Sequence, residues 1–198
     1  MIKKILTVIV GTVIASYGID LAIHAGFGGA TLAVLWEGLS KTLGITMGQA
    51  SFAIALVMIA FCFFYNRRQI SWGTLIYQVF YSSFLDIFEP VLVYSESRVV
   101  NFFLMVLGIL ILAFGSALYS YADFGRGSYE AMTFAFVERN GFQTRNVRIT
   151  LDIICVVLGA LLGGKFGLCT IATIALSGVC LQFVFGLLQK YDPLKMSS

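Results

Sequence analysis

The residues with the clearest chemical potential are carboxylates that lie within or beside long apolar stretches of the chain. A charged side chain is costly at membrane depth, so an acidic residue there indicates a function or a specific partner. Five carboxylates meet this description: Asp20, Glu37, Asp86, Glu130 and Asp152. What each can do depends on the basic and polar groups that the fold brings beside it.

Arg148 and Asp152 are four residues apart, which places them one turn apart on the same face of a helix. A direct ion pair inside the protein is the plain structural interpretation of this spacing. A coupling role in transport is the functional alternative. Because removing one partner would leave a poorly solvated charge, we expect the two residues to behave as a coupled pair.

Asp20 and His24 repeat this spacing near the end of the first apolar run, and His24 is the only histidine of the chain. Histidine titrates near neutral pH, so a histidine–carboxylate pair can relay protons. The plainer alternative is a histidine that is hydrogen-bonded at a helix end. We group Asp20, His24, Asp86, Arg148 and Asp152 as candidate coupling or ion-pair residues.

Catalytic and metal chemistry find little support in the sequence. The chain has no HExxH motif, no serine elbow and one histidine to serve as a base. Its four cysteines lie within apolar runs without CxxC spacing, which is typical of small buried apolar residues. They are Cys62, Cys155, Cys169 and Cys180. We expect no enzymatic activity, no metal site and no cofactor.

Two glycine-rich stretches are the candidate binding elements. AGFGGATL begins at Ala25 and ADFGRGSY begins at Ala122, and each precedes a short helical segment. A helix that begins inside a protein presents unpaired N–H groups and a partial positive charge, and glycine lets a ligand approach the backbone closely. Thr31 and Ser128 occupy matching positions, where they can cap the helices or contact a ligand. The candidate substrate-binding residues are Gly26, Gly28, Gly29, Thr31, Glu37, Asp123, Gly125, Gly127, Ser128 and Glu130.

The two stretches belong to an internal duplication with an offset of ninety-seven residues. Among the matching positions, Gly11, Gly18 and Gly44 recur as Gly108, Gly115 and Gly141. The chain therefore divides into a first repeat, residues 1–94, and a second repeat, residues 95–198. Glu37 and Glu130 do not match, so the two half-sites differ chemically, which suits an asymmetric solute better than a bare ion.

The elements that carry these residues are membrane helices. Hydrophobic residues make up 59% of the chain, charged residues 12%, and the mean hydropathy is +0.92, which excludes a soluble domain. Six apolar runs approach the roughly 20 residues that a helix needs to cross a bilayer. They are Ile5–Ile23, Met47–Phe64, Ser71–Phe88, Val99–Ser120, Val147–Gly164 and Leu168–Leu188. We read the first run as a retained helix, not a cleaved signal peptide.

Two further segments, Thr31–Leu43 and Ser128–Asn140, are too short to span. They are either re-entrant half-helices that dip into the protein or helices that lie in the membrane interface. Because a surface helix needs no glycine-rich start, we expect re-entrant segments at 24–45 and 121–142. The fold class predicted is thus an all-α integral membrane protein with six transmembrane helices in two three-helix repeats, each with one re-entrant half-helix.

The basic residues predict orientation. With both termini in the cytoplasm, ten basic residues lie inside and three, Lys41, Arg98 and Lys165, lie outside. Three spans in each half then make the two repeats inverted, a recurring transporter plan with its site near the membrane midplane. The net charge of +3 is explained by this asymmetry, and we expect no nucleic-acid partner.

Several motifs resemble one known family. GLSKTLGITMGQAS at Gly38–Ser51, RNGFQTRNVRITLD and LGALLGGKFGLCTIATIALSG together resemble the YczE/YitT-like bacterial integral membrane proteins over nearly the whole chain. The resemblance implies a multi-pass protein of the bacterial cytoplasmic membrane. Two departures concern the ligand: the first glycine loop lacks a Pro-Trp pair, and Asp152 stands where the family leads us to expect glutamate.

The leading functional hypothesis is a secondary transporter or exporter of a small polar or anionic solute, with its site between the two glycine loops. Alternatives are a passive channel, a membrane interaction or regulatory module without a central cavity, and a lipid-handling protein, which a groove open to the bilayer would favour. Small residues at Gly11, Ala15, Gly18 and Ala22 form a packing stripe. The partner helix of this stripe lies in the same chain or in a second copy, and a homodimer is therefore one possibility.

Overall fold

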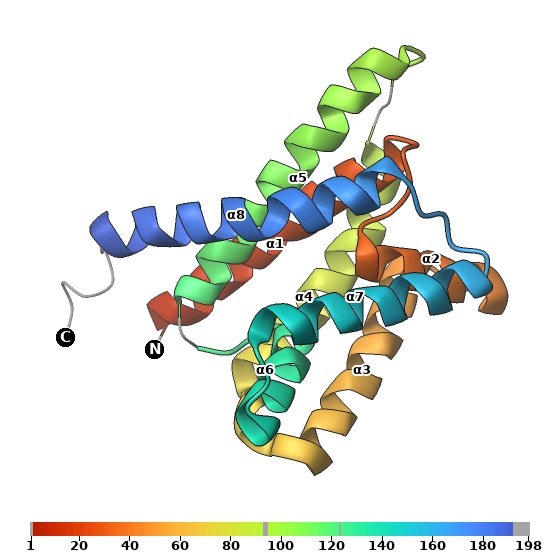
Figure 1. Ribbon diagram of the computed structural model, residues 1–198. Helices are drawn as coiled ribbons and strands as arrows, with labels where there is room; N and C mark the ends of the chain where they lie inside the picture. Colours follow the sequence, from red (N-terminus) through yellow and green to blue (C-terminus); the bar gives the residue numbers. More distant parts are fainter. Residues whose placement is uncertain (1, 93–94, 123, 192–198) are drawn as a thin grey trace.

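The computed structural model describes residues 2–92, 95–122 and 124–191, and within them all regular structure is helical. Figure 1 shows the arrangement of the eight α-helices. They are α1 (Ile2–His24), α2 (Thr31–Leu43), α3 (Met47–Asn66), α4 (Trp72–Phe88), α5 (Arg98–Tyr121), α6 (Ser128–Asn140), α7 (Thr144–Leu161) and α8 (Leu168–Tyr191). Short 3-10 turns follow α3 and α4, at Arg67–Gln69 and Glu89–Val91. The predicted all-α class is confirmed.

The short helices of the two halves begin and end at equivalent residues. The short helices α2 and α6 each have 13 residues and end at a glycine with left-handed backbone, Gly44 with φ 67° and Gly141 with φ 69°. Only glycine adopts this conformation without strain, so it ends both helices sharply. Thr46 then starts α3 with a capping box, accepting a hydrogen bond from the Gln49 backbone N–H.

The predicted packing stripe joins α1 to α5 of the same chain, with the two helices antiparallel. Gly11 lies against Gly115, and Gly18 lies against Gly108. A methyl group on Gly11 would stand 2.6 Å from the backbone nitrogen of Tyr119, so only glycine allows this approach. The stripe is therefore occupied within one chain and gives no support to a homodimer.

The short helices pack across the boundary between the halves. Helix α2 of the first half lies along α7 of the second, and α6 of the second half lies along α3 of the first, as Figure 1 shows for α2 and α7. Each glycine loop likewise contacts the other half of the chain. The Phe27 carbonyl accepts from the Cys169 N–H at 3.0 Å, and the Phe124 carbonyl accepts from the Ser71 hydroxyl at 3.0 Å. The described parts of the two halves are thus interlocked.

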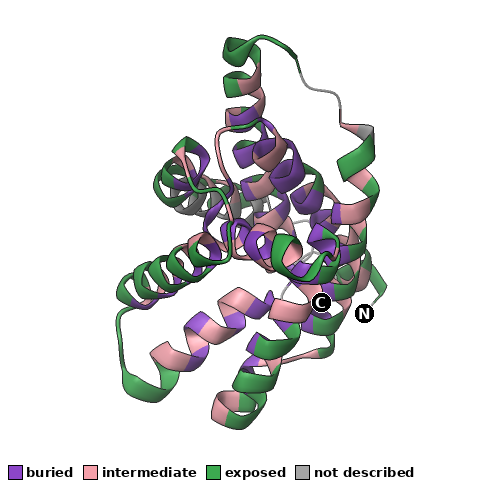
Figure 2. Cartoon of the chain, turned by 90° about the vertical axis from the view of Figure 1, so that its right-hand side faces the viewer, coloured by how far each residue is buried: buried purple, intermediate pink, exposed green. Residues whose placement is uncertain are grey.

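The outer surface is that of a membrane protein. Large apolar side chains are exposed along α3, α5, α7 and α8, including Phe64 at 86% and Leu161 at 79%. Figure 2 shows buried residues along the inner faces and exposed residues outside. In the described residues three helices have the length and hydropathy to cross a membrane, Ile2–His24, Met47–Gln69 and Arg98–Tyr121. The chain is therefore a multi-pass membrane protein, and six spans remain a prediction.

Candidate functional site

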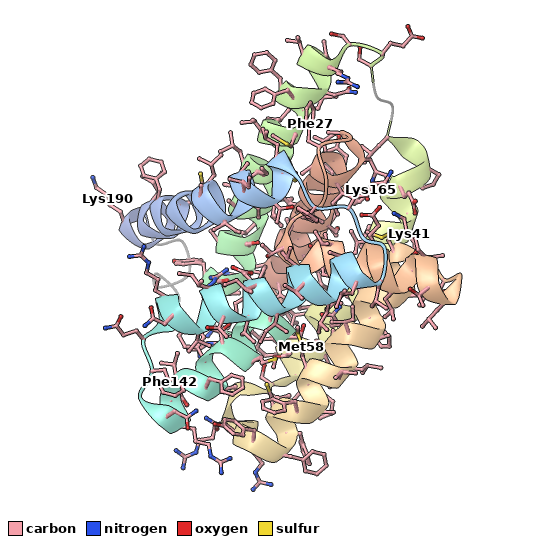
Figure 3. All side chains as sticks on the ribbon, turned by 45° about the vertical axis from the view of Figure 1, so that its right-hand side comes forward. Phe27, Lys41, Met58, Phe142, Lys165 and Lys190 are labelled. Atoms are coloured by element: carbon pink, nitrogen blue, oxygen red, sulfur yellow. The ribbon has the colours of Figure 1, made fainter. Side chains whose placement is uncertain are left out.

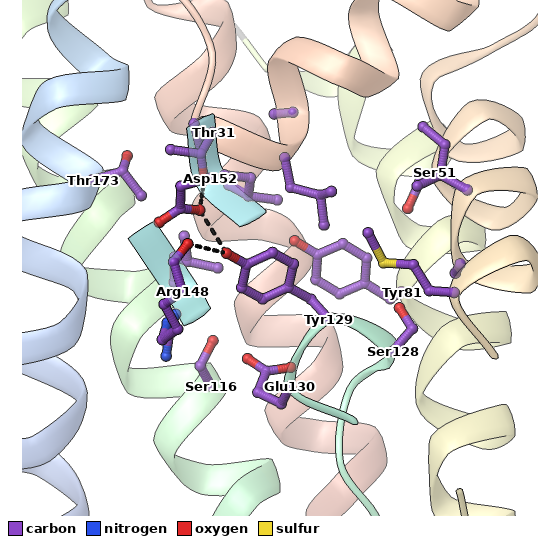
Figure 4. A pocket seen from close by; sticks show the side chains of 18 of the residues that line it. Thr31, Ser51, Tyr81, Ser116, Ser128, Tyr129, Glu130, Arg148, Asp152 and Thr173 are labelled. Carbon is purple, nitrogen blue, oxygen red and sulfur yellow. Dashed lines mark hydrogen bonds between the residues drawn. The ribbon is translucent and has the colours of Figure 1, made fainter. Parts of the chain in front are cut away.

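A cavity of about 670 Å³ lies where the two short helices begin. Both halves of the chain line it, and Thr31 and Ser128, the first residues of α2 and α6, face it from opposite elements. Figure 4 shows the polar side chains that converge there. The main polar groups in the wall are Thr31, Gln78, Ser128, Tyr129, Glu130, Arg145, Arg148 and Asp152.

Asp152 connects the starts of both short helices. Its Oδ1 accepts a hydrogen bond from the Thr31 hydroxyl at 2.7 Å and another from the Tyr129 hydroxyl at 2.7 Å (Figure 4). A carboxylate is favoured near helix N-termini, where backbone N–H groups are unpaired. The Asp152 side chain on α7 thus ties α2 and α6 to a common point in the cavity wall.

Ser128 has a different partner from its counterpart Thr31. Its hydroxyl donates to Gln78 Oε1 at 3.2 Å, and the Gln78 amide donates to Ser82 at 2.9 Å and to Ser51 at 3.4 Å. Neither Thr31 nor Ser128 is the N-cap, because the caps are Ala30 and Gly127. The two matching hydroxyls therefore hold neighbouring helices and line the cavity.

The predicted direct ion pair between Arg148 and Asp152 is not formed. The ion pairs among the described residues join Asp20 to His24, His24 to Glu89 and Glu37 to Lys41. The Asp152 carboxylate has hydroxyl donors instead. The half-buried Arg148 guanidinium lies 5.7 Å from the centre of the Tyr129 ring and makes no hydrogen bond or ion pair with a described side chain. Arg148 therefore offers free donors to the cavity.

Glu130 lies beside a group of tyrosines in the cavity wall. Its carboxylate and the Tyr119 hydroxyl both border Gly127. The Tyr77 ring centre is 4.5 Å from that of Tyr119 and 5.2 Å from that of Tyr81. This side of the cavity combines one carboxylate with rigid aromatic surface and hydroxyl groups.

The loop glycines do not line the cavity, contrary to the expectation that their backbone contacts the ligand. A methyl group on Gly28, whose φ is 86°, would stand 2.6 Å from the Gly167 nitrogen at the start of α8. One on Gly125 would stand 2.6 Å from the Thr74 nitrogen in α4. Their role is close packing between the halves. Gly26, Gly29 and Gly127 are also absent from the cavity lining, and Asp123 lies outside the described residues.

Glu37 is likewise placed away from the cavity. Its carboxylate forms an ion pair with Lys41 and accepts a hydrogen bond from the Lys165 backbone N–H at 2.8 Å. Lys41 also donates to the Gly163 carbonyl at 3.0 Å. Figure 3 shows Lys41 and Lys165 together at one end of the molecule. Glu37 therefore fastens the end of α2 to the loop before α8.

Asp86 serves as an anchor for α3. Its carboxylate accepts hydrogen bonds from the Thr46 hydroxyl and the Gly48 N–H, both at 2.7 Å. These donors belong to the first turn of α3, whose N–H groups lack partners within the helix. Asp86 therefore stabilises the start of α3, and the coupling role predicted for it remains a prediction.

Asp20 and His24 are in contact, as their spacing predicts. His24 Nδ1 lies 3.0 Å from Asp20 Oδ1, and His24 Nε2 lies 3.5 Å from Glu89. Asp20 is 1% exposed and does not line the cavity. The pair links the end of α1 to the end of α4, and a proton relay there remains a prediction.

Sequence reasoning missed several cavity residues. Tyr129 and Gln78 make central hydrogen bonds, and Trp36 is buried in the wall with its indole N–H lacking a partner among the described residues. Tyr129 adjoins the predicted Ser128, and Gln78 is a lone amide in an apolar run. Those two features are the only sequence signals for them, since their partners come from distant elements.

Comparison with known proteins agrees with the resemblance. Over 178 residues the chain is 25% identical to an uncharacterized membrane protein, YczE, of Bacillus subtilis, covering 87% of this chain and 81% of the relative. An uncharacterized protein of Haemophilus influenzae is 26% identical, with 89% and 81% covered. YyaS, an uncharacterized protein of Bacillus subtilis, is 22% identical, with 92% of each chain covered.

No solved structure matches the chain significantly. A family model described as a family of unknown function (DUF6198) matches residues 2–186. Together with the relatives, this match confirms the YczE-like relationship that the motifs predict. Because it spans nearly the whole sequence, the chain belongs to the family DUF6198.

Proposed function

We propose that this protein is a secondary transporter of a small polar or anionic solute in the bacterial cytoplasmic membrane. The observation that carries the proposal is the cavity of about 670 Å³ that the starts of both short helices share. Its volume falls in the range of small-molecule sites, and its wall combines apolar surface with a few convergent polar groups.

The hydrogen-bonding capacity that remains open in the cavity favours an anionic group. Asp152 Oδ1 already accepts two hydroxyl hydrogen bonds, whereas Arg148 has five N–H donors and no acceptor among the described side chains. A guanidinium matches the geometry of carboxylate and phosphate groups. The solute would therefore place its anionic group at Arg148.

The arrangement of α2 and α6 supports a site near the middle of the membrane. Each begins at the cavity, and they end at opposite ends of the molecule, near Lys41 and near Phe142 (Figure 3). Re-entrant half-helices that enter from opposite sides have this geometry. The antiparallel α1 and α5 agree with inverted repeats, and the basic residues favour cytoplasmic termini.

A coupled transporter accounts for the cavity better than the other hypotheses. An interaction or regulatory module needs no polar cavity. A passive channel needs a wet path open at both ends, whereas the exposed residues of the cavity lining lie on α7 and α8 alone within the described chain. The proposal includes no enzymatic step, no cofactor and no nucleic-acid partner, and one chain is sufficient to form the cavity.

Counterflow in liposomes tests the proposal. Purified protein would be screened with labelled amino acids, organic acids and vitamins, and we expect at least one solute to exchange. Arg148→Gln should lower its apparent affinity about tenfold or more, because a hydrogen bond to a charged group contributes about 1.5–3 kcal/mol. Arg68→Gln is the matched control, since Arg68 is exposed and outside the cavity. Exchange that Arg148→Gln leaves unchanged would contradict the assigned site.

A further inference from the structure

The cavity opens on one side, between α7 and α8. Among its lining residues the exposed ones are Arg145, Ile149 and Ile174, and the described chain offers no other exposed residue in the wall. Ile149 is 42% exposed and lies on α7, whereas Ile174 is 53% exposed and lies on α8. A residue that both lines a cavity and is exposed lies at its mouth, so these two isoleucines flank the entrance.

The opening exists because one packing contact of the repeat is missing. In the first half α3 packs along α4, but α7 and α8, their counterparts in the second half, share no comparable contact among the described residues. Figure 1 shows the two helices on the same side of the molecule. The pseudo-symmetric scaffold is thus closed on one side and open on the other.

The surroundings of the mouth are apolar. Next to Ile149 on α7, Ile153 is 57% exposed, and next to Ile174 on α8, Ile171 is 68% exposed. In a membrane protein such surfaces face the acyl chains. Since the mouth lies between two lipid-facing helix surfaces, it connects the cavity with the bilayer.

Two arginines at one end of the mouth determine how a bound molecule would be oriented in it. Arg145 lies at its edge in the first turn of α7, and Arg148 follows inside the cavity. Neither guanidinium forms an ion pair with a described carboxylate. Apolar surface from Ile54, Met58 and Leu112 continues inside the cavity. An occupant with an anionic head at the arginines would therefore lay its apolar part along the isoleucines.

We propose that the solute is an anionic amphiphile, with a carboxylate or phosphate head and an apolar chain, which enters laterally from the bilayer between α7 and α8. This inference rests on the proposed transport function and specifies its substrate class. Arg148 holds the head group, and Ile149 and Ile174 contact the chain. Each methylene group moved from water to an apolar site favours binding by about fourfold, so chain length decides affinity.

Trp36 provides the reporter for a direct test. The chain has two tryptophans, the cavity-lining Trp36 and Trp72, which is 78% exposed at the start of α4. In full-length Trp72→Phe protein, the fluorescence of Trp36 would be titrated with butyrate, octanoate and laurate, each brominated at the chain end so that contact quenches the indole. We expect tighter binding from butyrate to laurate, by about fourfold for each additional buried methylene.

Two variants in the Trp72→Phe protein test the head-group contact and the chain contact separately. Arg148→Gln should weaken binding of all three carboxylates about tenfold. Ile149→Phe combined with Ile174→Phe narrows the mouth, and should weaken laurate much more than butyrate, whose chain is shorter. Ile153→Phe is the matched control, because Ile153 is exposed on the same helix but does not line the cavity.

The outcomes distinguish this inference from the proposed function. Equal affinity for butyrate and laurate, with both weakened by Arg148→Gln, would overturn the amphiphile and keep the anion site. Laurate quenching that neither variant changes would indicate partition onto the protein surface and overturn the inference. If no carboxylate quenches Trp36 while another polar solute exchanges in liposomes, the inference fails and transport stands. Absence of both quenching and exchange would overturn both.

Discussion

Several pairs of equivalent positions line the cavity, and four of them differ in a consistent way. The first half contributes Leu32, Ala33, Ser51 and Ala55, and the second half contributes Tyr129, Glu130, Arg148 and Asp152 at the same places. All the charge of these four positions lies in the second half. The first half supplies small or apolar surface opposite it.

In this duplicated sequence the backbone geometry is shared by the two halves, whereas the chemistry of the side chains is not. The duplication keeps the bounds of the short helices, their glycine ends and the crossed loop contacts, so both halves contribute similar geometry to the cavity. The residue types at equivalent wall positions are less constrained, because each half supplies different partners to them, such as the hydroxyl groups that reach Asp152. The second half therefore carries the charged groups of the cavity wall, and α7 and α8 of that half lack the packing contact that α3 and α4 make.

The largest effect that distinguishes the halves is expected at the loop glycines. Gly28→Ala should cost about 3–5 kcal/mol, because it adds a clash with the Gly167 nitrogen to the strain of a left-handed backbone. Gly125→Ala meets the Thr74 nitrogen at the same distance of 2.6 Å but without a positive φ, and should cost about 1–3 kcal/mol. Thermal melting and size-exclusion chromatography in detergent measure both.

Gly26→Ala is the control for the strain alone. Gly26 has φ 85° and open space around its Cα, so this variant should cost about 1–2 kcal/mol. If Gly125→Ala proves as damaging as Gly28→Ala, the positive φ of Gly28 adds no cost beyond that of the clash.

The next effect concerns the anchors of the short helices. Asp152→Ala removes the acceptor of the Thr31 and Tyr129 hydroxyls, and should cost about 2 kcal/mol of folding free energy. Asp152→Asn retains an acceptor oxygen and should cost about half as much. Gln78→Leu, at the equivalent anchor of α6, should cost about 1 kcal/mol, because its bond from Ser128 is longer, at 3.2 Å. Thermal unfolding in detergent compares the three.

A double-mutant cycle tests the reassignment of Arg148. Arg148 forms no ion pair with Asp152, but both residues contact Tyr129, so the stability losses from Arg148→Gln and Asp152→Ala should deviate from additivity by less than about 1 kcal/mol. If the double variant is clearly more stable than the sum of the two single losses predicts, Arg148 and Asp152 form the coupled pair that their spacing predicts.

Local pattern was sufficient to predict the helices of this fold. Helix ends follow from residues that act locally, such as Gly44, Gly141 and the Thr46 capping box, and the predicted bounds Thr31–Leu43 and Ser128–Asn140 are those of the structure. The stripe of Gly11 and Gly18 predicted close packing but not its partner. That partner lies about a hundred residues away, where periodicity gives no information.

The hydrogen-bond partners of the site residues could not be predicted from the sequence for the same reason. The spacing of Arg148 and Asp152 places them on one helix face, but it does not show that hydroxyl groups of α2 and α6 reach the carboxylate first. Glu37 was assigned to the ligand because it lies in a short helix beside a glycine loop. The Lys165 backbone that it binds is brought to it by tertiary structure alone.

The smallest effect is predicted at Ser51, the counterpart of Arg148 in the first half. Ser51 is 1% exposed, and it accepts a 3.4 Å hydrogen bond from Gln78, which keeps its shorter bond to Ser82. Ser51→Ala should therefore shift the melting temperature by no more than about 2 °C and change solute affinity by less than about twofold. Measured beside Arg148→Gln in the same binding assay, it compares the two walls at one pseudo-symmetric position. An equal loss of affinity in both variants would mean that the first half also binds the solute, and that charge alone does not locate the site.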